Sequence, residues 1–474
     1  MPALPQINLP ILLPHILLAG SAVLILLIDL FLPPSKKSLN QLFAVIFLFI
    51  TFVVTAFTLW SNPQTSELLN GDRFSVFFFI IFVSAAVLVI MTADPYLRRN
   101  NINLGEFYAL IIFAVCGASV MAAAADLISL FLGLEIMSVS LYVLAGFQRQ
   151  KPASNEAAMK YFLIGAFFSG FFLFGAMLLY AATGTTSIYD LIVYANSSSP
   201  LFIGGAVLIL SAFAFKASLF PFHFWSPDVY DGAPTPIAAF MATGAKAAAF
   251  AALLRVFFYL YPKMGAPAES ALWMVAALTM TVGNVLALAQ SNIKRMLAFS
   301  SIAHAGYLFL GFLASNAATV QAVMFYLFVY TLMNVGAFTV AYLINVRGEG
   351  GYQLSNFAGA GMKNPFLAIV MAVFMFSLAG IPPTAGFFGK FYLFRAALDA
   401  GLVYLVIIAV LNSALSVYYY LRVLVIMFMQ KEVDLPALRY NLAVSVALIL
   451  CVIGILNFGI FPGSLMNMLA LAGL

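Results

Sequence analysis

The sequence predicts an all-α polytopic membrane protein with about fourteen transmembrane helices. Its 474 residues are 64% hydrophobic and only 8% charged, with a mean hydropathy of +1.08. A soluble domain of this length would carry about 25% charged residues. Apolar runs of about 20 residues, the length that crosses a bilayer, also follow one another along the whole chain. Composition and spacing therefore both predict membrane-spanning helices.

Each expected span is one of these apolar runs. The first run is longer than the apolar region of a cleavable signal peptide and no basic residues precede it, so we interpret it as a helix. The run at 364–397 is unusually long and contains Pro382 and Pro383. The expected spans are 11–32, 41–60, 74–93, 105–124, 127–147, 158–182, 201–222, 234–261, 271–289, 295–313, 319–346, 364–397, 402–429 and 440–461.

The loops predict the orientation. Alternate loops, beginning with 33–40, hold twelve lysines and arginines, whereas the other set holds only Arg73 and Lys263. Basic residues accumulate in cytoplasmic loops, so the first set is expected to face the cytoplasm. An even number of spans then places both termini on the periplasmic side. The loop 223–233 belongs to the cytoplasmic set but has no lysine or arginine.

Several function classes are excluded by composition and motif. A pI near 9.0 could suggest nucleic-acid binding, but the basic residues fall in short loops between apolar runs, where they set orientation. Cys116 and Cys451 lie in apolar stretches without metal or haem spacing. No nucleotide-binding glycine pattern appears. The chemistry is therefore expected to depend on side chains within the membrane.

Charged residues inside the predicted spans are the main functional signal. A charge at mid-bilayer costs roughly 2.5–3.5 kcal/mol, so repeated buried charges indicate an internal polar path. We expect the arginines to have structural roles because they stay charged at any relevant pH. The basic residues within spans are Lys160, Lys216, Lys246, Arg255, Lys390, Arg395 and Arg422.

Glu135 is expected near mid-membrane, nine residues beyond Asp126, with a lysine on another span close by. Lys216 precedes Pro221, which removes a backbone hydrogen bond and frees a carbonyl. Interrupted helices persist in membranes where the freed groups line a cavity. The alternatives are a fixed ion pair that only joins helices and a kinked helix whose lysine reaches the surface.

Lys390 lies in a second interrupted span, after the proline pair and among glycines. Paired interrupted helices in two halves of a chain indicate a transport site. Lys246 is surrounded by alanine and glycine, which leave room either for water or for tight packing around an unused lysine. His304 is a further candidate, because the ordinary pKa of histidine lies near neutral pH and suits proton transfer, although a lone histidine can also be a hydrogen-bonded core residue.

Four segments resemble one known family. They are FPFHFWSPDVYDGAPTPIAAFMATGAKAAAF (220–250), IKRMLAFSSIAHAGYL (293–308), GIPPTAGFFGKFYLF (380–394) and LGLEIMSVSLYVL (132–144). With the fourteen-span layout they resemble the antiporter-like subunits of the proton-pumping NADH–quinone oxidoreductase, respiratory complex I. The DVYDGAP form of the loop favours the subunit N family over the larger subunits L and M.

The resemblance implies an arrangement of units and a set of site residues. It implies two inverted five-helix repeats, at 105–262 and 263–430, with a three-helix segment (1–104) before them and the last span (431–474) after them. Glu135 and Lys216 would form the central pair of the first unit. Lys246 would connect the units, Lys390 would serve the second half-channel, and His304 would lie on the polar axis. Lys160 matches a further family lysine, and His223 lies in a specialised cytoplasmic link.

The implied function is proton translocation driven by quinone reduction elsewhere in a complex. The chain would be a translocase subunit without a redox centre, and FMN, iron–sulfur clusters and quinone would belong to partner subunits. The expected partners are other membrane subunits, especially M, K and J, and the lipid of a bacterial inner membrane; no nucleic acid is expected. A subunit of a multi-subunit sodium/proton antiporter is the alternative, and a purely structural subunit is a third hypothesis.

Overall fold

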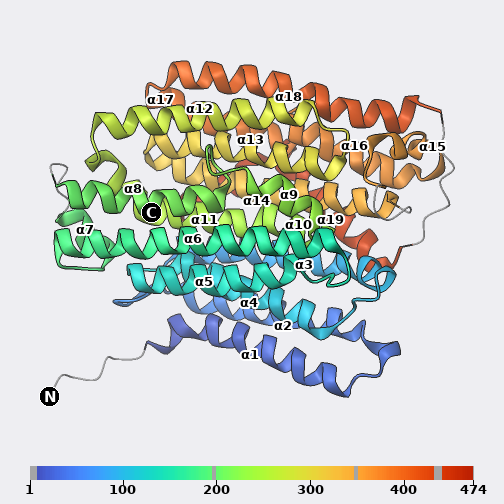
Figure 1. The fold of residues 1–474 in the computed structure, drawn as a ribbon, viewed down its shortest axis with the longest axis horizontal. Coiled ribbons are helices and arrows are strands. Elements are labelled where there is room, and N and C mark those ends of the chain that lie inside the picture. Colours follow the sequence, from blue (N-terminus) through green and yellow to red (C-terminus); the bar gives the residue numbers. More distant parts are fainter. Residues whose placement is uncertain (1–7, 195–198, 346–350, 432–439, 473–474) are drawn as a thin grey trace.

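The fold is a bundle of helices that lie side by side, with α1 and α2 at one side and α18 at the opposite side (Figure 1). A computed structural model describes residues 8–194, 199–345, 351–431 and 440–472. Within these residues, thirteen helices are long and apolar enough to cross a membrane, and Pro365–Ala379 is a shorter apolar helix. The predicted fold class is confirmed.

The long helices account for most of the chain, and short helices connect them. The described helices are α1 (Leu9–Phe31), α2 (Leu39–Thr55), α3 (Arg73–Arg99), α4 (Gly105–Ala123), α5 (Leu127–Ala145), α6 (Pro152–Thr183), α7 (Ile188–Val193), α8 (Pro200–Ala217), α9 (Trp225–Gly232), α10 (Thr235–Phe240), α11 (Lys246–Leu260), α12 (Ala266–Leu288), α13 (Ile293–Ala314), α14 (Ala317–Ile344), α15 (Ala360–Lys363), α16 (Pro365–Ala379), α17 (Ala385–Asp399), α18 (Val403–Met429), α19 (Leu442–Ile460) and α20 (Pro462–Ala470). Two short strands, β1 (Gln64–Thr65) and β2 (Asn70–Gly71), form an antiparallel hairpin.

Two predicted spans are interrupted, as expected. The span predicted at 364–397 consists of α16 and α17, which are separated at Gly380–Thr384. The span predicted at 201–222 stops at Ala217, where Ser218 adopts a left-handed conformation, and helix resumes at α9. In both places proline cannot donate the backbone hydrogen bond that a continuous helix needs. The division into inverted five-helix units remains a prediction.

The centre of the bundle is formed by α11, α13 and α14. Apart from Arg295, every residue of α13 is buried. The helices α1, α2, α6 and α18 expose large apolar side chains instead, such as Phe49, Phe167 and Leu411. An apolar exterior is the surface that a bilayer stabilises. The central helices therefore have the least contact with the surroundings, and α11 and α13 carry the buried Lys246, Lys294 and His304.

Helices α4 and α5 approach each other closely. A Cβ atom on Gly117 would lie 2.3 Å from the backbone nitrogen of Met137, and one on Gly133 would lie 2.8 Å from the carbonyl oxygen of Gly117. Small residues at a contact allow two membrane helices to bring their backbones together. This contact fixes the position of α5, which carries Glu135.

Two of the seven expected buried cations are exposed, so the sequence-based expectation was wrong for Lys160 and Arg395. The Lys160 side chain is 40% exposed and that of Arg395 is 68% exposed. The α6 helix has 32 residues. At 1.5 Å per residue it is about 48 Å long, more than the roughly 30 Å of hydrocarbon, so its end can project from the membrane. Arg395 lies near the end of α17, beside Asp399.

Arg255 has the structural role that we expected. Its side chain is 1% exposed, and its guanidinium group pairs with Asp72 through Nη1–Oδ2 (2.5 Å) and Nη2–Oδ1 (2.9 Å) contacts. It also donates to the carbonyl oxygen of Ala122. Burial alone would raise the pKa of the Asp72 carboxyl, but the adjacent Arg255 charge and hydrogen bonds hold that pKa below its ordinary value. The pair fastens α11 to the beginning of α3.

Candidate functional site

Lys216 lies at the last turn of α8, immediately before the interruption. Its side chain is 7% exposed. The ammonium group donates to the Tyr142 hydroxyl (3.2 Å) and lies 4.9 Å and 5.0 Å from the ring centres of Tyr142 and Tyr161. The aromatic faces and the negative end of the helix dipole both favour a positive charge here. Among the residues that the structure describes, the site therefore stabilises an ammonium group without a direct carboxylate partner.

Glu135 and Lys216 do not form a direct ion pair in the described part of the chain. Instead, Glu135 Oε1 accepts a hydrogen bond from the Ser169 hydroxyl on α6 (2.5 Å). Glu135 and Tyr142 are seven residues apart on α5, which places them on the same helix face two turns apart. Tyr142, which contacts Lys216, therefore lies on the same face of α5 as Glu135.

Lys246 is buried at the beginning of α11, after a π-helical turn at Met241–Ala245. Such turns are frequent at functional sites because they redirect a side chain within a helix. The ammonium group donates to the backbone oxygen of Ser301 (2.7 Å) and also contacts the Ser301 hydroxyl. Lys246 is thereby connected to α13 at the centre of the bundle.

His304 has a hydroxyl group at each ring nitrogen. Nδ1 contacts the Tyr326 hydroxyl, and Nε2 lies 2.9 Å from the Tyr420 hydroxyl. The Tyr420 hydroxyl also lies 2.5 Å from that of Ser300. A neutral imidazole donates through one nitrogen and accepts through the other, while a tyrosine hydroxyl can do both. His304 can therefore exchange a proton with either neighbour.

Lys390 extends back to the interruption between α16 and α17. Its ammonium group donates to the carbonyl oxygens of Leu378 and Ala379 and to the Ser413 hydroxyl, each at 3.0 Å. The two carbonyls belong to the last turn of α16, where the helix has no further N–H groups to offer them. Like Lys216, Lys390 thus places its charge at the carboxyl end of a half-helix, the negative end of its dipole.

A set of amides and hydroxyls continues from Lys390 through the bundle. The Lys390 ammonium lies 5.2 Å from the ring centre of Tyr307. Asn284 Nδ2 donates to the Tyr307 hydroxyl (3.1 Å), and Asn284 Oδ1 accepts from the Tyr419 hydroxyl (2.9 Å). Tyr419 is the chain neighbour of Tyr420, which contacts His304. Polar groups therefore line the region between Lys390 and His304.

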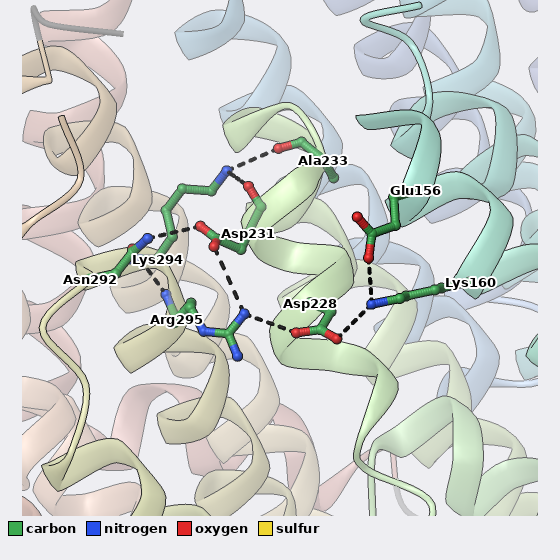
Figure 2. Close-up of polar contacts among 8 residues, drawn as sticks. All are labelled: Glu156, Lys160, Asp228, Asp231, Ala233, Asn292, Lys294 and Arg295. Carbon is green, nitrogen blue, oxygen red and sulfur yellow. Dashed lines mark hydrogen bonds and ion pairs between the residues drawn. The ribbon is translucent and has the colours of Figure 1, made fainter. Parts of the chain in front are cut away.

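A second cluster surrounds α9 at the predicted cytoplasmic end. Figure 2 shows Asp228 between Lys160 of α6 and Arg295 of α13. Lys160 Nζ lies 3.0 Å from Asp228 Oδ2 and 2.7 Å from Glu156 Oε1, and Arg295 Nη1 lies 2.9 Å from Asp228 Oδ1. Lys160 is thus part of an ion-pair cluster around α9 and not of the contacts made by Lys216, Lys246 and Lys390.

Lys294 binds the carboxyl end of α9. It is 2% exposed and donates to the backbone oxygens of Asp231 (2.6 Å) and Ala233 (3.0 Å), as Figure 2 shows. Asn292 donates to Asp231 Oδ1 (3.0 Å). The loop 223–233 has no lysine or arginine of its own, and its carboxylates and backbone oxygens therefore pair with cations on α6 and α13. The sequence indicated no role for Lys294, which we expected to lie in a loop.

The cluster shifts the titration of Asp228. Partial burial alone would raise the pKa of this carboxyl, but hydrogen bonds from Lys160 and Arg295 lower it below its ordinary value.

His223 lies apart from the other candidate residues. Its ring stacks on Phe220, with centres 5.6 Å apart, and burial lowers its pKa. Among the described residues, no hydrogen-bond partner faces His223 Nδ1.

A bundle with two interrupted spans and buried lysines among hydroxyl groups defines an antiporter-like membrane protein. The family model described as NADH:quinone oxidoreductase/Mrp antiporter, TM, matches residues 124–416. NADH-quinone oxidoreductase subunit N of Trichlorobacter lovleyi is 47% identical over 468 residues, covering 97% of this chain and 96% of the relative. The chain belongs to the subunit N family of NADH–quinone oxidoreductases.

Two solved structures have the same fold. A chain of respiratory complex I from Thermus thermophilus, in a structure with bound aureothin, has a TM-score of 0.83 and 35% identity, with 97% of this chain and 100% of that chain covered. A chain of the Mrp complex from Dietzia sp. DQ12-45-1b has a TM-score of 0.86 but only 20% identity, with coverages of 98% and 97%. This second likeness shows the fold alone.

Proposed function

We propose that the chain is a proton-translocating membrane subunit of NADH–quinone oxidoreductase. The observation that carries the proposal is the set of hydroxyl and amide groups around the buried Lys246, His304 and Lys390. The similar relatives are named as subunits of this complex, which supports the assignment of the chain to it. The sodium/proton antiporter alternative is not favoured, because the relatives at 42–47% identity are named NADH-quinone oxidoreductase subunit N, whereas the Mrp complex chain is only 20% identical.

In this mechanism the second unit conducts protons by relay. A proton on Lys246 passes by way of Ser301 and its neighbour Ser300 to Tyr420, and from there to His304. Serine and tyrosine hydroxyls both donate and accept, so each can pass a proton on without keeping a charge. Water bridges the steps between groups that do not touch. Lys390 is the last buried proton carrier of the series.

The first unit acts as the control element of the mechanism. Ser169 holds Glu135, and the Tyr142 hydroxyl contacts the Lys216 ammonium. Movement of charge in a neighbouring subunit would alter the attraction between Glu135 and Lys216. Lys216 is buried and Glu135 is half-buried, so salt screens this attraction less than it would between two exposed charges. Lys216 then gains or releases a proton towards Lys246.

Partner subunits supply the redox chemistry of this mechanism. FMN, iron–sulfur clusters and quinone belong to those partners, and this chain acts as a translocase subunit with no redox centre of its own. Subunits M, K and J are the proposed membrane neighbours. The complex lies in a bacterial inner membrane, with both termini of this chain on the periplasmic side.

The proposal is tested by proton pumping in the assembled complex. A Lys216→Ala/Lys246→Ala variant is reconstituted in liposomes, and the acidification driven by NADH oxidation is measured. We expect a clear loss of pumping relative to a Lys36→Ala/Lys431→Ala control, which removes two exposed cations. Pumping at the wild-type level by the first variant, in a fully assembled complex, would overturn the proposal.

A further inference from the structure

A cleft lined by both polar and apolar residues lies between two loops at the predicted cytoplasmic end of the bundle. It has a volume of about 570 Å³, and it is bounded by the α3–α4 loop and by the loop between α5 and α6. Its lining includes Asn100, Leu104, Glu106, Phe147, Arg149 and Lys151. None of these residues belongs to the candidate proton path, and the cleft is separate from the cluster around Asp228.

The cleft offers donors and positive charge. Lys151 donates to the Asn100 side chain (3.2 Å). Within the described residues, neither Arg149 nor Lys151 is in an ion pair, and the Arg149 side chain is exposed. Gln148 accepts from the Tyr96 hydroxyl through Oε1 (3.0 Å), which leaves its amide nitrogen as a donor. Glu106 is exposed at the rim and is the one carboxylate in the lining. The cleft therefore favours an anion that accepts several hydrogen bonds.

An apolar surface leads away from the cleft along α5. Val143 precedes the lining residue Phe147 by four residues, about one helical turn. Val143, Val139 and Leu132 are 47%, 52% and 54% exposed on this helix. Leu104, within the cleft, is 44% exposed. A ligand that combines an anionic head with apolar chains matches both surfaces, whereas a free anion would leave the apolar surface uncovered.

We infer that this cleft binds the headgroup of an anionic glycerophospholipid, with an acyl chain along the exposed face of α5. The headgroup phosphate lies against Arg149 and Lys151, and Asn100 and Gln148 supply hydrogen bonds. Basic pockets between membrane helices at the cytoplasmic side bind anionic headgroups in this way. The charge of Arg149 and Lys151 thus does more than set the orientation of a loop.

Lipid add-back to the delipidated complex tests the inference. The complex is purified in detergent, and native mass spectrometry measures retention of phosphatidylglycerol and of phosphatidylcholine with identical acyl chains. We expect wild type to retain phosphatidylglycerol preferentially. Loss of two basic contacts in an Arg149→Gln/Lys151→Gln variant should weaken retention about 10- to 30-fold. A Lys36→Gln/Lys431→Gln variant removes the same charge outside the cleft and should retain the lipid.

Three results would overturn the inference. The first is equal retention of the two lipids by the wild-type complex, a comparison that needs no variant to fold. The second is equal retention of phosphatidylglycerol by the two double variants. The third is displacement of phosphatidylglycerol by inorganic phosphate at millimolar concentration, which would identify a free-anion site. Preferential retention that is lost only in the cleft variant supports the lipid site.

Discussion

At the residue scale, the proposed proton path consists of titratable side chains that hydroxyl groups join. Tyr420 is the clearest case, because its hydroxyl lies 2.9 Å from His304 Nε2 and 2.5 Å from the Ser300 hydroxyl. Phenylalanine at this position would keep the ring packing while removing both contacts. A Tyr420→Phe substitution therefore distinguishes a role of Tyr420 in proton transfer from a role in packing.

We predict that Tyr420→Phe slows proton translocation while the complex still assembles. A hydrogen bond is worth about 1 kcal/mol, which corresponds to roughly a fivefold change in a rate. The rate of pumping by reconstituted complex is the measurement. Tyr418→Phe is the matched control because Tyr418 lies on the same helix and is 63% exposed. If both variants pump like wild type, Tyr420 is not part of the path.

The sequence predicted the titratable residues of the site better than their partners. Lys216, Lys246 and Lys390 are costly in a membrane, so each is conspicuous in an apolar span. Tyr420 is not conspicuous among 21 tyrosines. Its contact with His304 joins residues 116 positions apart, a separation that no local pattern encodes. The exposure of Lys160 was missed for a related reason, since periodicity does not show how far a helix projects.

At the scale of elements, helix contacts hold the site together. We predict that Gly117→Ala destabilises the chain, because its Cβ would lie 2.3 Å from a backbone atom of α5. Overpacking of this kind typically costs about 1–3 kcal/mol. Thermal unfolding of the purified protein measures the effect. Gly170→Ala is the control, since nothing lies within 4 Å of that Cβ. Equal unfolding temperatures for the two variants would contradict a tight α4–α5 contact.

The ion pairs around α9 predict a pH dependence. Because the pKa of Asp228 is lowered in the folded state, its contribution to stability is present above the ordinary carboxyl pKa of about 4 and is lost as the pH falls through the lower folded value. Asp228→Asn should therefore reduce the unfolding temperature at neutral pH, and the difference from wild type should shrink as the pH falls below about 4. The loss should be about 1 kcal/mol, since the pairs are partly exposed. A difference that persists at low pH would contradict this assignment.

At the scale of the whole molecule, the sequence predicted the number and order of the spans well. Length and hydropathy determine which segments cross a bilayer, and prolines mark both interruptions. The short helices α7, α15 and α20 were not predicted, because each is shorter than a membrane span. The sequence also did not predict which faces of the helices contact one another. The helix α13 carries polar and charged residues yet is almost wholly buried, because other helices surround it.

The central claim is that the buried lysines Lys216, Lys246 and Lys390 carry protons. The ratio of protons moved to NADH oxidised, measured in liposomes with the reconstituted complex, tests it most directly when Lys390→Met is compared with Arg395→Met. Both residues lie on α17, but Lys390 is 4% exposed and holds two helix-end carbonyls, whereas the Arg395 side chain is 68% exposed. We predict a lower ratio for Lys390→Met and an unchanged ratio for Arg395→Met. Equal, wild-type ratios for both variants would contradict the claim.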